Sequence, residues 1–127
     1  MTDKSQEVHV VLVSDRAARS YPAFLCVNTA AQMGHKAYIY LTSDALSIVK
    51  KGNIPEQMAG MPTLDQVLEM ALKLGVKVAA CGPSIEFLKA NGVTKESVKP
   101  GIELDTASSF LEKALAATKN GGILTYV

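Results

Sequence analysis

Cys81 is the residue of this chain with the clearest capacity for chemistry. It follows a short apolar, partly β-branched run at residues 76–80, a pattern that predicts a buried strand. Gly82 is expected to break that strand, and Pro83 to stand where the next helix begins. The thiol would then lie at the carboxyl end of a strand and face the amino end of a helix. Ligands bind at this edge of an open α/β sheet.

The expected helix start would favour the charged form of the thiol. Gly82 and Ser84 could donate backbone amides to a substrate at Cys81, whereas Pro83 has no N–H to donate. Such a setting lowers the pKa of a cysteine from about 8.5 to about 3.5–7.5, and the thiolate could act as a nucleophile or carry a sulfur atom. The alternative is a structural cysteine, since this residue type is often buried as a small hydrophobe. Glu86, in the first helical turn, is interpreted as complementing the helix dipole.

The two arginines of the chain, Arg16 and Arg19, both follow the first expected strand. Arginine suits bidentate binding of small oxyanions. If that strand ends near the strand of Cys81, Arg16 is a candidate contact for an anionic sulfur donor or for the thiolate. The alternative is a pair of solvated loop charges.

The remaining candidate residues favour structural roles. Cys26 lies inside an expected helix, where a core or subunit contact is favoured over a role as a resolving thiol for Cys81. His9 and His35 have no partner at metal-ligand spacing, so we expect neither a metal site nor a functional histidine. No glycine-rich phosphate loop follows the first strand, and no cofactor is expected.

Strand and helix patterns alternate along the whole chain and predict an α/β fold. Five strands would form a mostly parallel sheet with helices on both faces, as in flavodoxin-like or Rossmann-like proteins. Thr63 opens an expected capping box, and Asp105 is expected to cap the last helix. We expect strands at 8–13, 36–41, 76–80, 101–104 and 123–127, and helices at 21–33, 45–51, 64–74, 83–90 and 106–119.

Length and composition narrow the class of protein. A chain of 127 residues is expected to form a single domain over residues 1–127, and its net charge of +1 gives no reason to expect nucleic acid as a partner. The opening residues 1–7 are polar rather than a basic and apolar leader, and no apolar run approaches the roughly 20 residues that span a bilayer. With two widely spaced cysteines, the chain is expected to be cytoplasmic, to keep its thiols reduced and to have no membrane as a partner.

The order of these segments resembles the DsrE/DsrF-like family of small sulfur-handling proteins. The segment 28–42 is similar to the family's helix, glycine turn and strand, and 46–52 to its next helix. The run 76–81, with Gly82-Pro83-Ser84, matches the family's third strand and cysteine turn, and 98–104 its fourth strand. Each match is weak alone, but their order and spacing together are fairly specific.

The resemblance implies a three-layer α/β/α sandwich that assembles into homo-oligomers, as dimers, trimers or hexamers. It also implies a sulfur carrier of the sulfurtransferase type, with a persulfide or thiosulfonate on Cys81 that passes from a donor protein to an acceptor protein. Two alternatives stay open. One is a non-enzymatic, oligomeric small-molecule-binding or regulatory protein in which Cys81 is structural, and the other is a redox protein that pairs Cys81 with Cys26.

Overall fold

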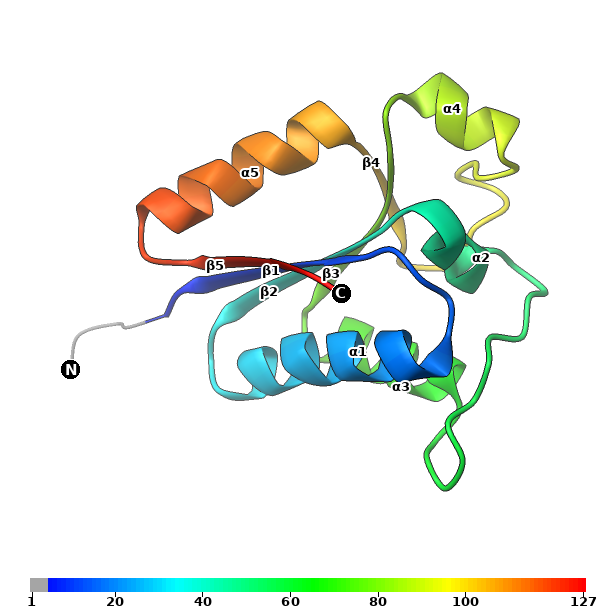
Figure 1. Ribbon diagram of the computed structural model, residues 1–127, viewed down its shortest axis with the longest axis horizontal. Coiled ribbons are helices and arrows are strands. Elements are labelled where there is room, and N and C mark those ends of the chain that lie inside the picture. The colour runs from blue at the N-terminus through cyan, green and yellow to red at the C-terminus, as the bar shows by residue number, and fades with distance from the viewer. Residues whose placement is uncertain (1–4) are drawn as a thin grey trace.

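The computed structural model describes residues 5–127 (Figure 1). Of the polar opening segment that argued against a leader, residues 1–4 lie outside this described part. The elements follow the order β1 (Glu7–Leu12), α1 (Ala17–Gln32), β2 (Lys36–Leu41), the 3-10 turn η1 (Ser43–Ala45), α2 (Leu46–Val49), α3 (Leu64–Lys73), β3 (Lys77–Gly82), α4 (Ile85–Ala90), β4 (Glu103–Thr106), α5 (Ala107–Lys119) and β5 (Ile123–Tyr126).

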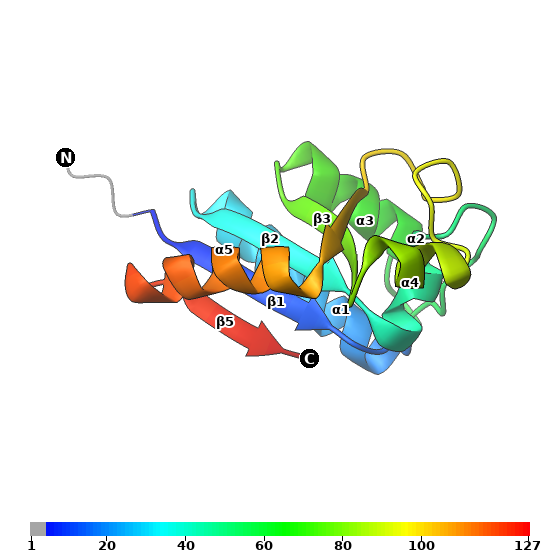
Figure 2. The same ribbon diagram turned by 90° about the horizontal axis from the view of Figure 1, so that it is seen from above.

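The strands form one five-stranded sheet in the order β4-β3-β2-β1-β5, and every neighbouring pair is parallel. Helices α1 and α3 cover one face of the sheet and α5 the other, while α2 and α4 lie toward the carboxyl ends of the strands (Figure 1). Seen from above, α5 crosses the sheet from the end of β4 to the start of β5 (Figure 2). The predicted α/β sandwich with a parallel sheet is therefore confirmed.

The two faces of the sheet carry different cores, because successive strand residues point to opposite sides. The larger core fills the space between the sheet and helices α1 and α3, and includes Val10, Phe24 and Ile39. The smaller core lies beneath α5 and consists of Val11, Tyr40, Ala79, Cys81, Phe110 and Ala114. The α5 face is thus only partly apolar, which leaves room on it for polar side chains.

Helix α1 begins at Ala17, four residues before the predicted start at residue 21. At its amino end, a carboxylate oxygen of the distant Glu56 accepts the N–H of Ala17, and the Oγ of the nearby Ser14 accepts the N–H of Arg16. Pro22 consequently lies inside the helix rather than at its first turn. The predicted start at residue 21 was wrong, since the first turn is completed by a carboxylate that comes from 39 residues further along the chain.

Pairing between β3 and β4 corrects two further predictions. Gly82 does not break β3 but ends it as a paired residue, opposite Thr106 of β4. Asp105 pairs with Cys81 inside β4, so the side chain that caps α5 is that of Thr106, whose Oγ1 accepts the N–H of Ser109. The capping box at Thr63 is confirmed. Local capping was therefore predicted well where the signal was local, and badly where strand pairing decided it.

Candidate functional site

The face of the sheet beneath α5 is lined by polar side chains at alternating strand positions. Because residues two apart in a strand share a face, each of four adjacent strands contributes a short row to this side. Between the sheet and α5 the rows enclose a cavity of about 440 Å³. Its lining residues are Glu7, Tyr38, Tyr40, Lys77, Ala79, Glu103, Asp105, Lys113 and Ala116. We refer to this cavity as the α5 pocket.

Cys81 lies at the carboxyl end of β3, as predicted, but it turns away from the helix that follows. A Cβ added to Gly82 would lie 2.9 Å from Phe87, so Gly82 faces α4. Successive strand residues face opposite sides, and Cys81 therefore points toward α5, where it packs with Phe110 and Tyr40. The thiol is adjacent to the α5 pocket without lining it, and only 5% of the residue is exposed.

The surroundings of Cys81 favour the neutral thiol. Burial raises the pKa of Cys81, the negative charge of Asp105 raises it further, and the ammonium group of Lys113 acts in the opposite direction; the result is about 11. The lowered pKa expected from a helix start is therefore wrong. The expectation failed because it placed the thiol at the amino end of α4, whereas the group facing Cys81 is a carboxylate of the neighbouring strand.

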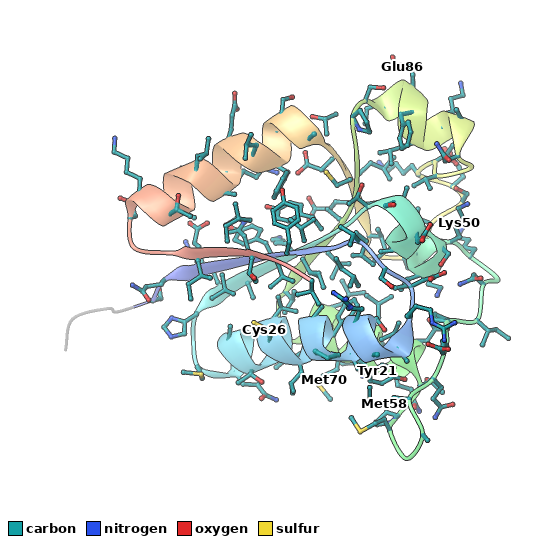
Figure 3. All side chains as sticks on the ribbon, in the orientation of Figure 1. Tyr21, Cys26, Lys50, Met58, Met70 and Glu86 are labelled. Carbon is teal, nitrogen blue, oxygen red and sulfur yellow. The ribbon has the colours of Figure 1, made fainter. Side chains whose placement is uncertain are left out.

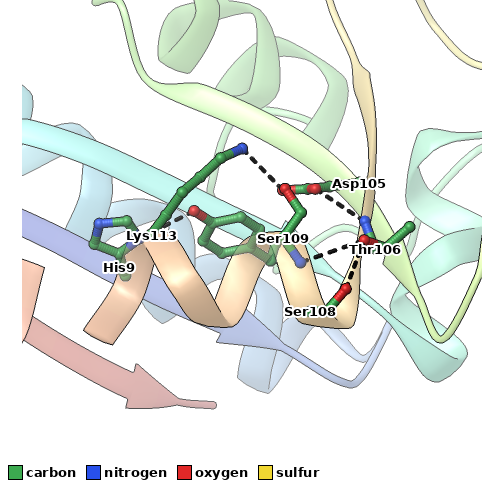
Figure 4. A network of polar contacts seen from close by, with 7 residues as sticks. His9, Asp105, Thr106, Ser108, Ser109 and Lys113 are labelled. Carbon is green, nitrogen blue, oxygen red and sulfur yellow. Dashed lines mark hydrogen bonds and ion pairs between the residues drawn. The ribbon is translucent and has the colours of Figure 1, made fainter. Parts of the chain in front are cut away.

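Asp105 is held in place by bonds on both carboxylate oxygens (Figure 4). Its Oδ1 accepts the N–H of Thr106 at 2.9 Å, and its Oδ2 lies 3.1 Å from the Nζ of Lys113 on α5. The Asp105 side chain is 10% exposed and that of Lys113 is 50% exposed. This ion pair ties the sheet edge to α5 and fixes the charge that faces Cys81.

A second polar chain runs from Glu7 through His9 to Tyr40. His9 is completely buried, with Nε2 3.0 Å from Glu7 Oε1 and Nδ1 3.0 Å from the hydroxyl of Tyr40. The Glu7 carboxylate can only accept, so Nε2–H donates to it, and in the neutral ring Nδ1 accepts the O–H of Tyr40, whose pKa is raised by burial and by the Asp105 carboxylate. The ring of His9 also stacks on Tyr38, with centroids 4.2 Å apart.

The sequence interpretation gave His9 no role because it sought partners close in sequence or at metal spacing. The signal that could have found this network is the repeat of polar residues two apart within otherwise apolar strands. Glu7 and His9 share such a row, as do Tyr38 and Tyr40 on the next strand. A half-polar strand buried by a helix predicts bonded side chains on that face.

The other predicted site residues lie around Cys81 without converging on it. Gly82 is buried against α4, and the Oγ of Ser84 accepts the N–H of Phe87 at 3.1 Å as the cap of α4. The guanidinium of Arg16 pairs with Glu56 at 3.2 Å with its side chain 75% exposed, and it lines a separate pocket beside the 53–56 loop. Arg16 follows β1 and Ser84 follows β3, and strand β2 lies between these two strands.

Cys26 is exposed on α1 (Figure 3), so of the expected core or subunit contact the core contact is wrong. Cys81 lies across the sheet, on the α5 face, and both cysteines are free. The placement of the two thiols on opposite faces contradicts the paired redox alternative.

Residues 5–127 hold neither a candidate metal site nor a candidate membrane span. No group of three or more His, Cys, Asp or Glu side chains is placed to hold a metal ion, and no helix is long and apolar enough to span a membrane. The one other histidine, His35, accepts the N–H of Gln6 through its Nδ1.

Comparison with known proteins agrees with the geometry. The chain is 32% identical over 108 residues to an uncharacterized protein of Methanopyrus kandleri, a match that covers 83% of this chain and 84% of that one. Two uncharacterized proteins of Methanocaldococcus jannaschii are 29% and 31% identical over 75% and 73% of this chain, which corresponds to 34% and 76% of their own lengths. The model of the DsrE/DsrF-like family matches residues 8–120. With this match over most of its length and the parallel sheet described above, the chain belongs to the DsrE/DsrF-like family.

Proposed function

We propose that this protein is a sulfur carrier of the sulfurtransferase type, which holds sulfane sulfur on Cys81 and passes it to a partner thiol. The observation that carries the proposal is the position of Cys81, at the carboxyl end of β3 and beside the α5 pocket, in a member of a family associated with sulfur relay. The carboxyl edge of a parallel sheet is where small ligands are bound in α/β proteins.

The proposed transfer has two steps, each of which makes one bond to sulfur and breaks one. The Cys81 thiolate attacks the outer sulfur of a donor persulfide; a Cys81 persulfide forms and the donor leaves as a thiolate. An acceptor thiolate then attacks that outer sulfur, gains it as a persulfide and releases the Cys81 thiolate. No net oxidation or reduction takes place.

The burial of Cys81 sets a condition on this chemistry. With a pKa of about 11, about one Cys81 in ten thousand is ionised at pH 7. Sulfur transfer at neutral pH therefore requires that donor binding uncover Cys81, and the residues to be displaced are those that cover it, chiefly Phe110 at the start of α5. Of the predicted donor contacts, Gly82 is buried against α4, which leaves Ser84 at the start of α4 and Arg16 beside the 53–56 loop as the proposed contacts at the rim of this edge, away from the face on which the thiol lies.

We also propose that the chain works in the cytoplasm as a homo-oligomer with donor and acceptor proteins as partners. Two free cysteines suit a reducing compartment. Apolar side chains are exposed on two helices of the molecule, Leu111 and Leu115 on α5 and Ile85 and Phe87 on α4. Such groups support an interface with another protein or another copy.

The test is intact mass spectrometry after incubation with polysulfide, thiosulfate or tetrathionate. Because Cys26 is exposed, it would react with these donors on its own, so all variants carry Cys26→Ser. The carrier proposal predicts added sulfur on the peptide containing Cys81, its removal by a thiol acceptor, and no adduct in the Cys81→Ser partner variant. No adduct with any of the three donors, together with slow alkylation of Cys81, would overturn it.

A second function is favoured by the burial of the thiol. A residue that is 5% exposed and has a raised pKa is typical of a structural cysteine. The chain would then be a non-enzymatic, oligomeric small-molecule-binding or regulatory protein that uses the α5 pocket. The same mass-spectrometry experiment tests this alternative, since a structural Cys81 acquires no sulfur. A binding measurement on Cys81→Ser adds to it, since ligand binding in the α5 pocket should survive the loss of the thiol.

A further inference from the structure

The rings of Tyr38 and Tyr40 form one wall of the α5 pocket. They lie two residues apart on β2, their planes differ by 5°, and their centroids are 6.4 Å apart. The ring of His9, on the neighbouring strand β1, stacks on Tyr38 at 4.2 Å with an interplanar angle of 5°. Neighbouring strands in a sheet are about 4.8 Å apart, which is close to the distance between the two stacked rings. The rings therefore stand side by side like the strands that carry them, and each turns its faces toward the neighbouring strands. One face of Tyr38 is therefore covered by His9, and the other is turned toward β3.

The side of this wall that faces β3 is left open beside Tyr38. The register partner of Tyr40 on β3 is Ala79, whose small side chain fills little of the pocket. Phe110 packs on Tyr40 at 4.4 Å and closes that part of the wall. The ring of Tyr38 has no such cover among the ring contacts of residues 5–127, and its register partner is the flexible side chain of Lys77.

The charged groups around this opening restrict the ligand. Three carboxylates and two ammonium groups line the pocket, so an additional anion is disfavoured. Asp105 and Lys113 neutralise one another, and Glu7 is bonded to His9. The groups that remain for a ligand are the Glu103 carboxylate, which accepts hydrogen bonds, and the Lys77 ammonium, which donates them.

We infer that the α5 pocket binds a planar heteroaromatic base without negative charge, stacked on Tyr38 as the third ring after His9. Amino or ring N–H groups of the base donate to Glu103, and a ring nitrogen or carbonyl accepts from Lys77. The volume of about 440 Å³ is within the range of about 300–1,000 Å³ for small-molecule sites. This inference does not depend on sulfur transfer, since Cys81 is not part of the pocket lining.

Adenine is the probe for the test, with two comparison compounds. Benzoate is planar but anionic, and cyclohexylamine can donate hydrogen bonds but cannot stack. Binding to the full chain is measured by titration calorimetry, and contact is located by saturation-transfer NMR and by shifts of the Tyr38 ring signals. We expect adenine to bind more tightly than either comparison compound.

Variants of single tyrosines then test the stacking. Tyr38→Leu should weaken adenine binding about tenfold or more, whereas Tyr38→Phe keeps the ring and should keep the affinity. Tyr126→Leu is the matched control, because Tyr126 lies exposed on β5 outside the pocket lining. Glu103→Gln should weaken binding, and Cys81→Ser should leave it unchanged.

Three results would overturn the inference: no adenine binding at millimolar concentration, an equal loss in Tyr38→Leu and Tyr126→Leu, or benzoate binding as tightly as adenine. Circular dichroism of each variant excludes loss of folding as the cause. The failure of this inference is distinguishable from that of sulfur transfer, because the first is measured by ligand binding and the second by mass added to Cys81.

Discussion

Asp105 and Cys81 are register partners on β4 and β3, and both side chains lie on the α5 face of the sheet. The pairing sets a carboxylate next to a thiol that is already buried, and both effects oppose ionisation of the sulfur. Lys113 bonds to that carboxylate and partly offsets it. A residue 24 positions later in the chain thus lowers the reactivity of the cysteine further, in addition to burial, which is the larger cause.

Replacing Asp105 by Asn should make Cys81 more reactive. The substitution removes the negative charge, keeps an amide oxygen for the N–H of Thr106, and leaves the Lys113 ammonium without its carboxylate. The pKa of Cys81 should fall below about 11, although burial, the larger cause, keeps it above the ordinary value. The check is the pH dependence of iodoacetamide alkylation in a Cys26→Ser background, and an unchanged midpoint would contradict the assignment.

The stability of the protein should fall as the pH rises from about 9 to about 11. The pKa of Cys81 is raised from 9.0 to about 11 on folding, so the folded state holds the thiol proton more tightly than the unfolded state. This contribution is complete below about pH 9 and is lost as the pH approaches the folded pKa. It amounts to a loss on the order of 2 kcal/mol at pH 10.5.

Denaturant unfolding of the wild type and of Cys81→Ala at pH 8 and pH 10.5 isolates this contribution, because lysines and tyrosines titrate in both proteins. The wild type should lose more of its unfolding free energy than the variant over this interval. Equal losses in the two proteins would mean that Cys81 does not titrate differently on folding.

The Glu7–His9–Tyr40 chain predicts a measurable coupling. His9→Leu leaves the Tyr40 hydroxyl buried without its acceptor, and Tyr40→Phe leaves Nδ1 of His9 without its donor. Each change should cost about 1–3 kcal/mol of unfolding free energy. The double variant should cost less than the sum by about 0.5–3 kcal/mol, since it leaves neither polar group unpaired.

The same cycle made with His9 and Tyr38 is the control, because those rings stack without a hydrogen bond between them. Its coupling should be smaller than that of His9 with Tyr40. Additive effects in the His9 and Tyr40 cycle would show that the hydroxyl and the ring nitrogen do not depend on one another.

Elements whose signals are local could be predicted from the sequence. The bounds of β2 match the expected 36–41, and the Thr63 capping box is confirmed because Thr63 and Gln66 are three residues apart. The start of α1 could not be predicted in this way, because it depends on a carboxylate of Glu56 in a later loop. A pattern read within one segment has no access to such a partner.

The candidate site likewise has one part that local sequence signals predict and another that depends on strand pairing. The place of Cys81 at the end of β3 follows from a short apolar run, so it was predicted. Its electrostatic surroundings were not, because the sequence does not reveal that Asp105 pairs with it in the register of β3 with β4. His9 was missed for the same reason, since Tyr40 reaches it only through the pairing of β1 with β2.

Gly82 should be the position at which the turn after Cys81 tolerates least change. An alanine Cβ there would lie 2.9 Å from Phe87 Cδ1 and 3.0 Å from Leu88 Cδ2, and Leu88 is completely buried. Relief requires the Phe87 ring to turn away and the buried Leu88 side chain to move by a few tenths of an ångström, and Gly82→Ala should lower the unfolding free energy by about 1–3 kcal/mol through overpacking. Phe87 is 40% exposed, so shortening it to alanine in the same chain should recover part of the loss. Urea unfolding of the single and double variants measures this recovery, and a Gly82→Ala protein as stable as the wild type would mean that α4 does not press on this glycine.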